Sequence, residues 1–262
     1  MKAIVIAAGR GKRLGAHTEE LPKCLVQVGD RPILGWVARA FEAAGVDELV
    51  IIRGYRPDVL EAGARSIWKG KLRFVENREW ETNNILLSLA CARSELDGPC
   101  LVTYSDIIFT PAVARACAAH PADVALVIDQ ASRDIYVGRT EHPLDEGEVA
   151  DLDPSGHVRR VGKRALPPGD AFGEFIGLAK LSATGAAWFG DALDDLRARF
   201  SDDQPFQRAA RFRNAYLTDL IQHLIDAGRP VAPVAITGQW REIDTGQDLD
   251  RARILVQSKE WS

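Results

Sequence analysis

Short apolar runs and helix-spaced apolar sets alternate along the first 120 residues. The compact apolar runs predict buried strands at residues 3–8, 48–53, 72–75 and 100–104. The helix-spaced sets predict helices at residues 31–45, 57–67, 82–96 and 111–119. This alternation predicts an α/β fold in which a mostly parallel sheet is flanked by helices on both faces.

The pattern changes after about residue 121. Short apolar runs separated by turns predict strands at residues 125–129, 135–139, 148–152, 157–161 and 174–181. Asp153-Pro154-Ser155-Gly156 has the composition of a hairpin turn, so this section is expected to form a small antiparallel insert. The last part predicts helices at 182–200, 214–227 and 247–256 and strands at 231–236 and 240–244, with a mobile polar stretch at 201–212.

Length and charge narrow the class of protein. A chain of 262 residues fits one α/β domain that carries an insert. The net charge of −4 argues against a nucleic-acid partner, which would favour a basic surface. No apolar run approaches the ~20 residues that span a bilayer, and the chain opens directly on a strand rather than a signal peptide. We therefore expect a cytoplasmic protein without membrane insertion, whose four cysteines are reduced thiols.

A glycine-rich loop with basic residues follows the first strand. Gly9, Gly11 and Gly15 alternate with Arg10, Lys12 and Arg13. Glycines let backbone N–H groups turn toward an anion, and the cations add charge, so the loop predicts a phosphate cradle. The spacing does not fit a dinucleotide fingerprint, and Arg13 stands where a P-loop requires Ser or Thr.

A longer composite places the loop in a known family. Ala7-Ala8-Gly9, Gly11, Arg13, Pro22-Lys23 and Gly29-Asp30-Arg31-Pro32-Ile33 occur in order within the first 34 residues. The composite resembles the signature of nucleotidyltransferases that make nucleoside-diphosphate sugars and alcohols. The resemblance implies a Rossmann-like sheet and one domain, with residues 1–120 as the nucleotide-binding half and 121–262 as the acceptor-binding half that contains the insert.

The same resemblance assigns roles within the loop. It implies that Arg13 holds the β- and γ-phosphates and that Lys23 holds the α-phosphate and the acceptor, so both are candidate catalytic residues. Ala7, Ala8, Gly9 and Gly11 would contact the nucleotide. Lys12 replaces the usual Ser or Thr, and it would either add charge at the triphosphate or point to water.

Two acids at predicted strand ends are candidate ligands of magnesium. Asp106 follows an apolar strand, and Asp244 ends the sequence Trp-Arg-Glu-Ile-Asp. Two such carboxylates suit one Mg²⁺, which binds few protein oxygens and leaves positions for phosphates. The resemblance implies metal-binding acids at these positions. The alternatives are a solvated turn acid at Asp106 and a helix N-cap at Asp244.

A second motif narrows the resemblance. Asn77-x-x-Trp80-x-x-Asn83-Asn84, followed by a helix that contains Ser88, resembles the bacterial branch that transfers CMP to phosphocholine, phosphonates or phosphoamino acids. Asn83, Asn84 and Ser88 would then face the base of CTP, although helix capping is an alternative for the two asparagines. The implied reaction is attack by an already ionised phosphate or phosphonate on the α-phosphorus, with release of pyrophosphate and without a catalytic base.

The expected acceptor wall combines aromatic and acidic residues. The candidates for this wall are Tyr136, Glu174, Asp219 and Trp240, taken from a larger group that also contains Phe172, Phe175, Tyr216 and Glu242. Aromatic faces with carboxylates suit an ammonium group such as choline, although most of these aromatics could equally belong to the core. Two other functions stay open, a sugar-1-phosphate nucleotidyltransferase that uses UTP or dTTP and a non-catalytic nucleotide-binding module. A homodimer is possible.

Overall fold

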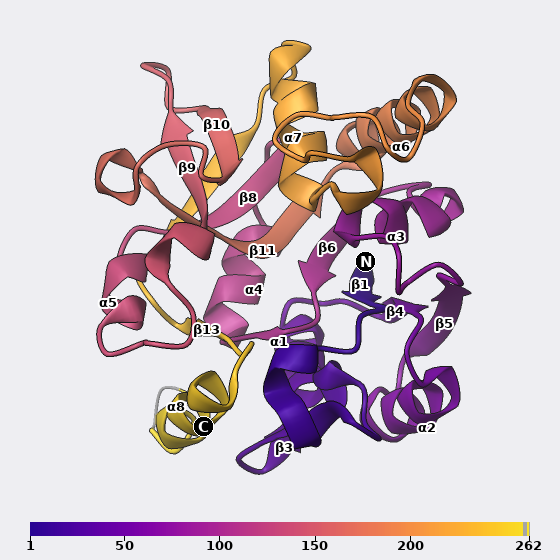
Figure 1. The fold of residues 1–262 in the computed structure, drawn as a ribbon, viewed down its shortest axis with the longest axis vertical. Coiled ribbons are helices and arrows are strands. Elements are labelled where there is room, and N and C mark those ends of the chain that lie inside the picture. Colours follow the sequence, from indigo (N-terminus) through magenta and orange to yellow (C-terminus); the bar gives the residue numbers. More distant parts are fainter. Residues whose placement is uncertain (259–260, 262) are drawn as a thin grey trace.

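The computed structural model describes residues 1–258 and 261, and its described residues form one central sheet of nine strands (Figure 1). Four strands from the first half of the chain are parallel to one another, as predicted: β1 (Lys2–Ala7), β4 (Glu48–Arg53), β5 (Lys71–Glu76) and β6 (Cys100–Tyr104). β1 lies between β4 and β6, so the loops that follow β1 and β6 emerge side by side at one edge of the sheet. This edge is where parallel sheets bind ligands.

The second half of the chain extends the sheet with mostly antiparallel strands. β11 (Gly173–Leu181) pairs antiparallel with β6, β8 (Val124–Asp129) and β9 (Glu148–Leu152), and β9 pairs with β10 (Val158–Lys163) across the predicted hairpin turn. β12 (Ala232–Ile236) adds a parallel partner to β8. The predicted antiparallel insert is therefore present, and it continues the main sheet.

Helices cover both faces of the sheet. Successive side chains of β1 point to opposite faces, so they pack against different helices. Ala3 and Val5 pack in a core cluster with α1 (Ile33–Ala43), α2 (Pro57–Ile67) and α4 (Pro111–Ala118). Ile4 and Ile6 belong to a second cluster with α3 (Ile85–Cys91), α6 (Ala183–Arg199) and α7 (Leu217–Asp226). Figure 1 shows α1 and α2 below β1 and β4, with α3, α6 and α7 above them.

Two short strand pairs lie outside the main sheet. β2 (Gln27–Val28) pairs with β3 (Arg31–Pro32), and β7 (Ile107–Phe109) pairs antiparallel with β13 (Trp240–Glu242). α8 (Gly246–Leu255) follows β13 and packs its apolar side in a third cluster with the β2–β3 region. Short 3-10 segments complete the chain at 12–18, 23–25, 93–95, 144–146, 168–170 and 212–214, and the first of them is kinked at Gly15.

Three sequence predictions were wrong in detail. Residues 135–139 are not a strand: α5 (Ser132–Tyr136) occupies this position, and Gly138 has a positive φ that ends regular structure, so the alternation of Ile135 and Val137 was misleading. The predicted helix 82–96 is confined to α3, followed by a separate turn at 93–95. The polar stretch 201–212 is anchored rather than loose, because Phe206 and Phe212 are buried against Phe200.

Candidate active site

A cavity of about 400 Å³ opens at the carboxyl ends of β1 and β6. It brings together thirteen of the sixteen residues that the sequence analysis selected: Ala8, Gly9, Gly11, Lys12, Arg13, Lys23, Asn83, Asn84, Ser88, Asp106, Glu174, Trp240 and Asp244. Ala7, Tyr136 and Asp219 do not line it. Residues from the first 110 positions and from the last 120 thus share one cleft, which we call the active-site cleft.

The glycine loop shapes one end of this cleft. Gly11 has φ +74°, and a side chain there would meet Lys23, whose Cδ lies 2.7 Å from the position of a Cβ. The hydroxyl of Thr18 donates a hydrogen bond to the carbonyl of Gly11 over 3.0 Å and fixes the turn. Only glycine combines this backbone conformation with this close approach, so Gly11 is required for the placement of Lys23.

Lys23 lies between the two predicted metal ligands. Its ammonium donates to Oδ2 of Asp106 over 3.0 Å and to Oδ1 of Asp244, and the residue is only 7% exposed. Burial alone would lower the pKa of Lys23, but the carboxylates of Asp106 and Asp244 outweigh it and hold the pKa above its ordinary value. Lys23 is therefore a firmly charged group at the centre of the cleft.

The pairing of β7 with β13 explains why Asp106 and Asp244 meet. Ile107 lies opposite Glu242 in this ladder, and the backbone N–H of Ile243 donates to the carbonyl of Asp106 over 2.8 Å. Asp106 directly precedes β7, and only Ile243 separates Asp244 from the end of β13. Both carboxylates therefore lie at the same end of this antiparallel strand pair. Positions 138 residues apart in the chain thereby form one acidic pair.

Asp244 does not serve as a helix cap. The N-cap of α8 is Thr245, which forms a capping box with Asp248. Oδ2 of Asp244 instead accepts a hydrogen bond of 2.5 Å from Arg13. Burial would raise the pKa of Asp244, but Lys23, His142 and Arg13 together hold it well below the usual range. The carboxylate is thus ionised and surrounded by groups that favour its charge.

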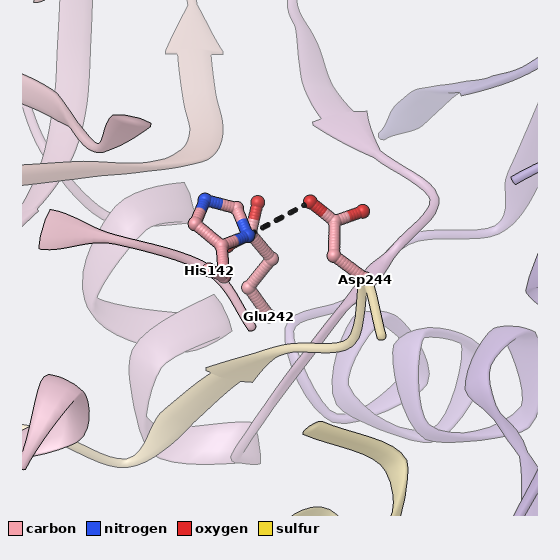
Figure 2. Close-up of side chains that lie close together, drawn as sticks. All are labelled: His142, Glu242 and Asp244. Atoms are coloured by element: carbon pink, nitrogen blue, oxygen red, sulfur yellow. Dashed lines mark ion pairs between the residues drawn. The ribbon is translucent and has the colours of Figure 1, made fainter. Parts of the chain in front are cut away.

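Two further residues lie beside this pair: His142, which the sequence analysis did not select, and Glu242, which it grouped with the acceptor wall. Figure 2 shows His142 and Glu242 gathered around Asp244. Nδ1 of His142 lies 3.3 Å from Oδ2 of Asp244 and 3.7 Å from Oε2 of Glu242. Burial and the charges of Asp244 and Asp106 raise the pKa of Glu242 to about 7. His142 stands in a turn-rich stretch without local signal, so only the tertiary structure reveals it.

A polar network forms the part of the cleft nearest α3. The buried amide of Asn77 donates to Oδ1 of Asn83 over 2.8 Å and to the hydroxyl of Ser88 over 2.9 Å. Asn84 occupies the N-cap position of α3, but its side chain donates to the carbonyl of Asn214 and makes no capping hydrogen bond. The capping alternative therefore does not account for these asparagines.

Buried carboxylates dominate the opposite wall. Glu174 is 4% exposed and accepts a hydrogen bond of 2.8 Å from the hydroxyl of Tyr136. Burial, reinforced by the charge of Glu242, raises the pKa of Glu174 to about 8. Glu148 accepts hydrogen bonds from the hydroxyls of Tyr104 and Thr218, over 2.8 and 2.7 Å. This wall is acidic, and neutral hydroxyls hold the carboxylates of Glu174 and Glu148.

Three predicted acceptor residues have structural tasks. Asp219 forms the capping box of α7, accepts from the backbone N–H of Tyr216 over 2.8 Å and borders a neighbouring cavity instead of the cleft. Tyr136 stands behind Glu174 and orients it. Trp240 lines the cleft but is 3% exposed, and its indole N–H donates to Oδ2 of Asp129 over 2.7 Å. Of this group, Glu174 presents a polar group to the cleft.

The fold and this cleft define a nucleotide-transferring enzyme, and the comparisons agree. The sequence profile of the MobA-like NTP transferase domain matches residues 3–171. The chain belongs to this family and is a nucleotidyltransferase. No helix among the described residues is both long and apolar enough to cross a membrane.

Similar proteins include several cytidylyltransferases. CTP:phosphoglutamine cytidylyltransferase of Campylobacter jejuni is 27% identical over 260 residues, which are 95% of this chain and 98% of that protein. 2-Aminoethylphosphonate cytidylyltransferase of Lancefieldella rimae is 26% identical over 86% of this chain and 85% of its own. The solved CTP:phosphocholine cytidylyltransferase of Streptococcus pneumoniae shares the fold, with a TM-score of 0.72 and 19% identity over 97% of this chain and 98% of that one.

Proposed function

We propose that this enzyme transfers CMP from CTP to a small phosphorylated alcohol, phosphonate or phosphoamino compound that carries an ammonium group, and releases pyrophosphate. The observation that carries the proposal is the order of charges along one cleft. Lys12, Arg13 and Lys23 lie at the glycine loop, Asp106 and Asp244 lie in the middle, and Glu174 lies in the opposite wall. Relatives named for phosphoglutamine and 2-aminoethylphosphonate support an acceptor of this kind.

The acceptor supplies its own nucleophile. A phosphate monoester has its second pKa near 6, so its oxygen is ionised at neutral pH and needs no base. That oxygen would attack the α-phosphorus of CTP in line, and the bond to the β-phosphate would break as pyrophosphate leaves. Lys23 would stabilise the charge on the α-phosphate, while Arg13 would bind the leaving phosphates.

Asp106 and Asp244 are suited to hold Mg²⁺. Oδ1 of Asp106 is a buried oxygen that has no hydrogen-bond partner among the described residues, and both carboxylates converge on the ammonium of Lys23. Hard carboxylate oxygens with room for phosphate are the ligand set that Mg²⁺ prefers. When bound, the ion would supply positive charge that stabilises the phosphates as pyrophosphate leaves.

Binding of the triphosphate would require an exchange of partners. Lys23 and Arg13 now neutralise Asp244, and a nucleotide would draw both cations toward its phosphates. The freed carboxylate oxygens would then be available to the metal. Arg13 can move because its side chain is about half exposed, whereas Lys23 is packed against Gly11 and would only redirect its ammonium.

Base selection would depend on the Asn77, Asn83 and Ser88 network. Amide groups offer both donors and acceptors, which suits the mixed hydrogen-bonding edge of cytosine. A site that hydrogen-bonds one base leaves buried polar groups unpaired when another base enters, so discrimination can be strong. We expect CTP to be used in preference to UTP, ATP and GTP.

The deciding experiment measures pyrophosphate release with each of the four nucleotides and dTTP against a panel of acceptors. The panel contains phosphocholine, 2-aminoethylphosphonate, a phosphoamino acid and glucose 1-phosphate, and mass spectrometry identifies each product. Fast reaction of CTP with an amine-bearing acceptor supports the proposal. Faster turnover of glucose 1-phosphate with UTP or dTTP would replace it with the sugar-nucleotide function, and no turnover with any pair would show that the proposed acceptor class is wrong.

A further inference from the structure

The stretch that carries His142 is held in place by α8. Oε1 of Gln247 accepts hydrogen bonds from the backbone N–H groups of Thr140 and Glu141, over 2.8 and 3.3 Å. Arg251 donates to the carbonyls of Ile135 and Val137, over 2.9 and 3.0 Å. These contacts fix both sides of the turn that leads to His142. The imidazole is therefore a built part of the cleft, and it is only 2% exposed.

The three side chains in Figure 2 have the spacing of metal ligands. With metal–ligand bonds of about 2.1 Å, neighbouring donors lie about 3.0 Å apart in an octahedron and about 3.4 Å apart in a tetrahedron. Nδ1 of His142 is 3.3 Å from Oδ2 of Asp244 and 3.7 Å from Oε2 of Glu242. The three donor atoms all lie within 4.8 Å of one another, so small side-chain adjustments would place one cation among them.

A positive group of the protein already occupies this position. A guanidinium nitrogen of Arg13 lies 2.5 Å from Oδ2 of Asp244, and its other terminal nitrogen lies 3.5 Å from Nδ1 of His142. Arg13 is the mobile member of the group because its side chain is 54% exposed. The position therefore attracts a cation, and the exposed side chain of Arg13 can leave it to a metal ion in the free enzyme as well as when a triphosphate binds.

The two oxygens of Asp244 face different neighbours. Oδ1 contacts Lys23, which also binds Asp106, whereas Oδ2 faces Arg13 and His142. Glu242 is held toward the Oδ2 side by Arg139, whose guanidinium lies 3.0 Å from Oε2 of Glu242 and is itself fixed by Asp248. A supporting network of this kind is typical of ligands that must keep their orientation.

We propose that His142, Glu242 and Oδ2 of Asp244 form a second cation site, next to the Asp106 site, that prefers transition-metal ions such as Mn²⁺ or Co²⁺ over Mg²⁺. An imidazole nitrogen suits transition metals, whereas Mg²⁺ prefers carboxylates and water. Asp244 would bridge the two sites with one oxygen each, as carboxylates do in two-metal phosphoryl-transfer centres. The inference does not depend on which base or acceptor the enzyme uses.

Mn²⁺ is the probe that tests this site, because pulsed EPR detects a directly bound imidazole nitrogen. Mn²⁺ binding is measured without nucleotide in the wild type, His142→Ala, His142→Gln and the matched control His157→Ala, whose histidine is on the exposed hairpin turn. We expect a nitrogen coupling in the wild type and the control. Both His142 variants should lose that coupling and bind Mn²⁺ about tenfold or more weakly.

Two further variants separate the neighbouring sites. Arg13→Gln removes the competing cation, so Mn²⁺ should bind more tightly and the nitrogen coupling should strengthen. Asp106→Asn should lose catalysis but keep the coupling, which distinguishes this proposal from the function proposed above. If His142 only orients Asp244 by a hydrogen bond, folded His142→Gln will bind Mn²⁺ as the wild type does and no variant will show nitrogen coupling; that result would overturn the second site.

Discussion

The two ends of the active-site cleft differ in how buried carboxylates are neutralised. We call the end around Arg13, Lys23, Asp106 and Asp244 the phosphate end, and the opposite wall with Glu174 and Glu148 the acceptor end. At the phosphate end, each acid has a cationic partner: Lys23 binds Asp106 and Asp244, and Arg13 binds Asp244. At the acceptor end, neutral hydroxyls hold the two buried acids, since Tyr136 donates to Glu174 and Tyr104 donates to Glu148, while the less buried Glu146 pairs with Lys163. The pKa values follow this difference. The pKa of Asp244 lies below its ordinary value, while burial raises those of Glu174 and Glu148.

This contrast indicates what each end is prepared to bind. The phosphate end is neutralised internally, and its cations become available when an anionic triphosphate offers new partners. At the acceptor end, the charge of a buried carboxylate is costly. Glu174 has no ion pair with a cationic side chain among the described residues. A positively charged acceptor would relieve that cost. The cleft is therefore suited to one highly anionic ligand and one ligand with a cationic group.

Lys23→Ala should have the largest effect of any single change. It removes the cation that faces the developing charge on the α-phosphate, so turnover should fall by about 10²–10³-fold or more with every acceptor. The matched change at the acceptor end is Lys163→Ala, which removes a lysine paired with Glu146 over 3.2 Å. That variant should alter KM for the acceptor and largely spare turnover. Steady-state kinetics on both folded variants test the contrast, and equal losses in kcat would contradict it.

Asp244→Asn should abolish most activity without uncapping α8, because Thr245 is the cap. The loss should appear as a weaker response of the rate to added Mg²⁺, and Asp106→Asn should behave alike. The matched control is Ser182→Ala, which removes a real cap: the Ser182 hydroxyl accepts from the backbone N–H of Gly185 over 3.1 Å in α6. That control should lose about 1 kcal/mol of stability and keep its rate. If Asp244→Asn melts early yet turns over normally, its metal role is wrong.

The phosphate end was the more predictable from sequence, for a physical reason. Gly11, Arg13 and Lys23 lie within one loop, and Asp106 and Asp244 stand at strand ends, where parallel sheets place functional groups. The acceptor end depends on contacts between distant segments. His142 acquires its place only through the contacts of α8, and Asp219 looked like a site acid but caps α7. Local pattern contains no information on such long-range partners.

A pair of substitutions should separate the two ends by their Michaelis constants. Glu174→Gln keeps the hydrogen bond from Tyr136 but removes the charge, so KM for an amine-bearing acceptor should rise about tenfold while KM for CTP stays constant. Asn83→Ala breaks the network with Asn77, so KM for CTP should rise by a similar factor and the acceptor KM should not. Initial rates with each substrate varied in turn provide the check. A rise of both constants in either variant would show that the two ends are not independent.

The smallest expected effect concerns stability and pH. Glu174 has a pKa of about 8 in the folded protein, against an ordinary value of 4.5. Between these values the folded state keeps a proton that the unfolded state has released, so the stability contribution is complete below pH 4.5 and is lost as pH rises through 8. The pKa of Asp244 is lowered instead, so its contribution to stability is lost only when the pH falls below its unfolded pKa. The titration of Asp244 itself therefore does not change stability between pH 5 and 8.

Denaturant unfolding of the wild type and Glu174→Gln, followed from pH 5 to 8 in a chelating buffer, isolates this contribution. The wild type should lose stability more steeply than the variant, by at most about 1.4 kcal/mol per pH unit for one proton. Asp244→Asn should also make the slope in this window shallower, because the charge of Asp244 helps to raise the pKa of Glu242 to about 7. Parallel slopes for the wild type and Glu174→Gln would mean that Glu174 is already ionised at neutral pH, and the acceptor end would then be neutralised like the phosphate end.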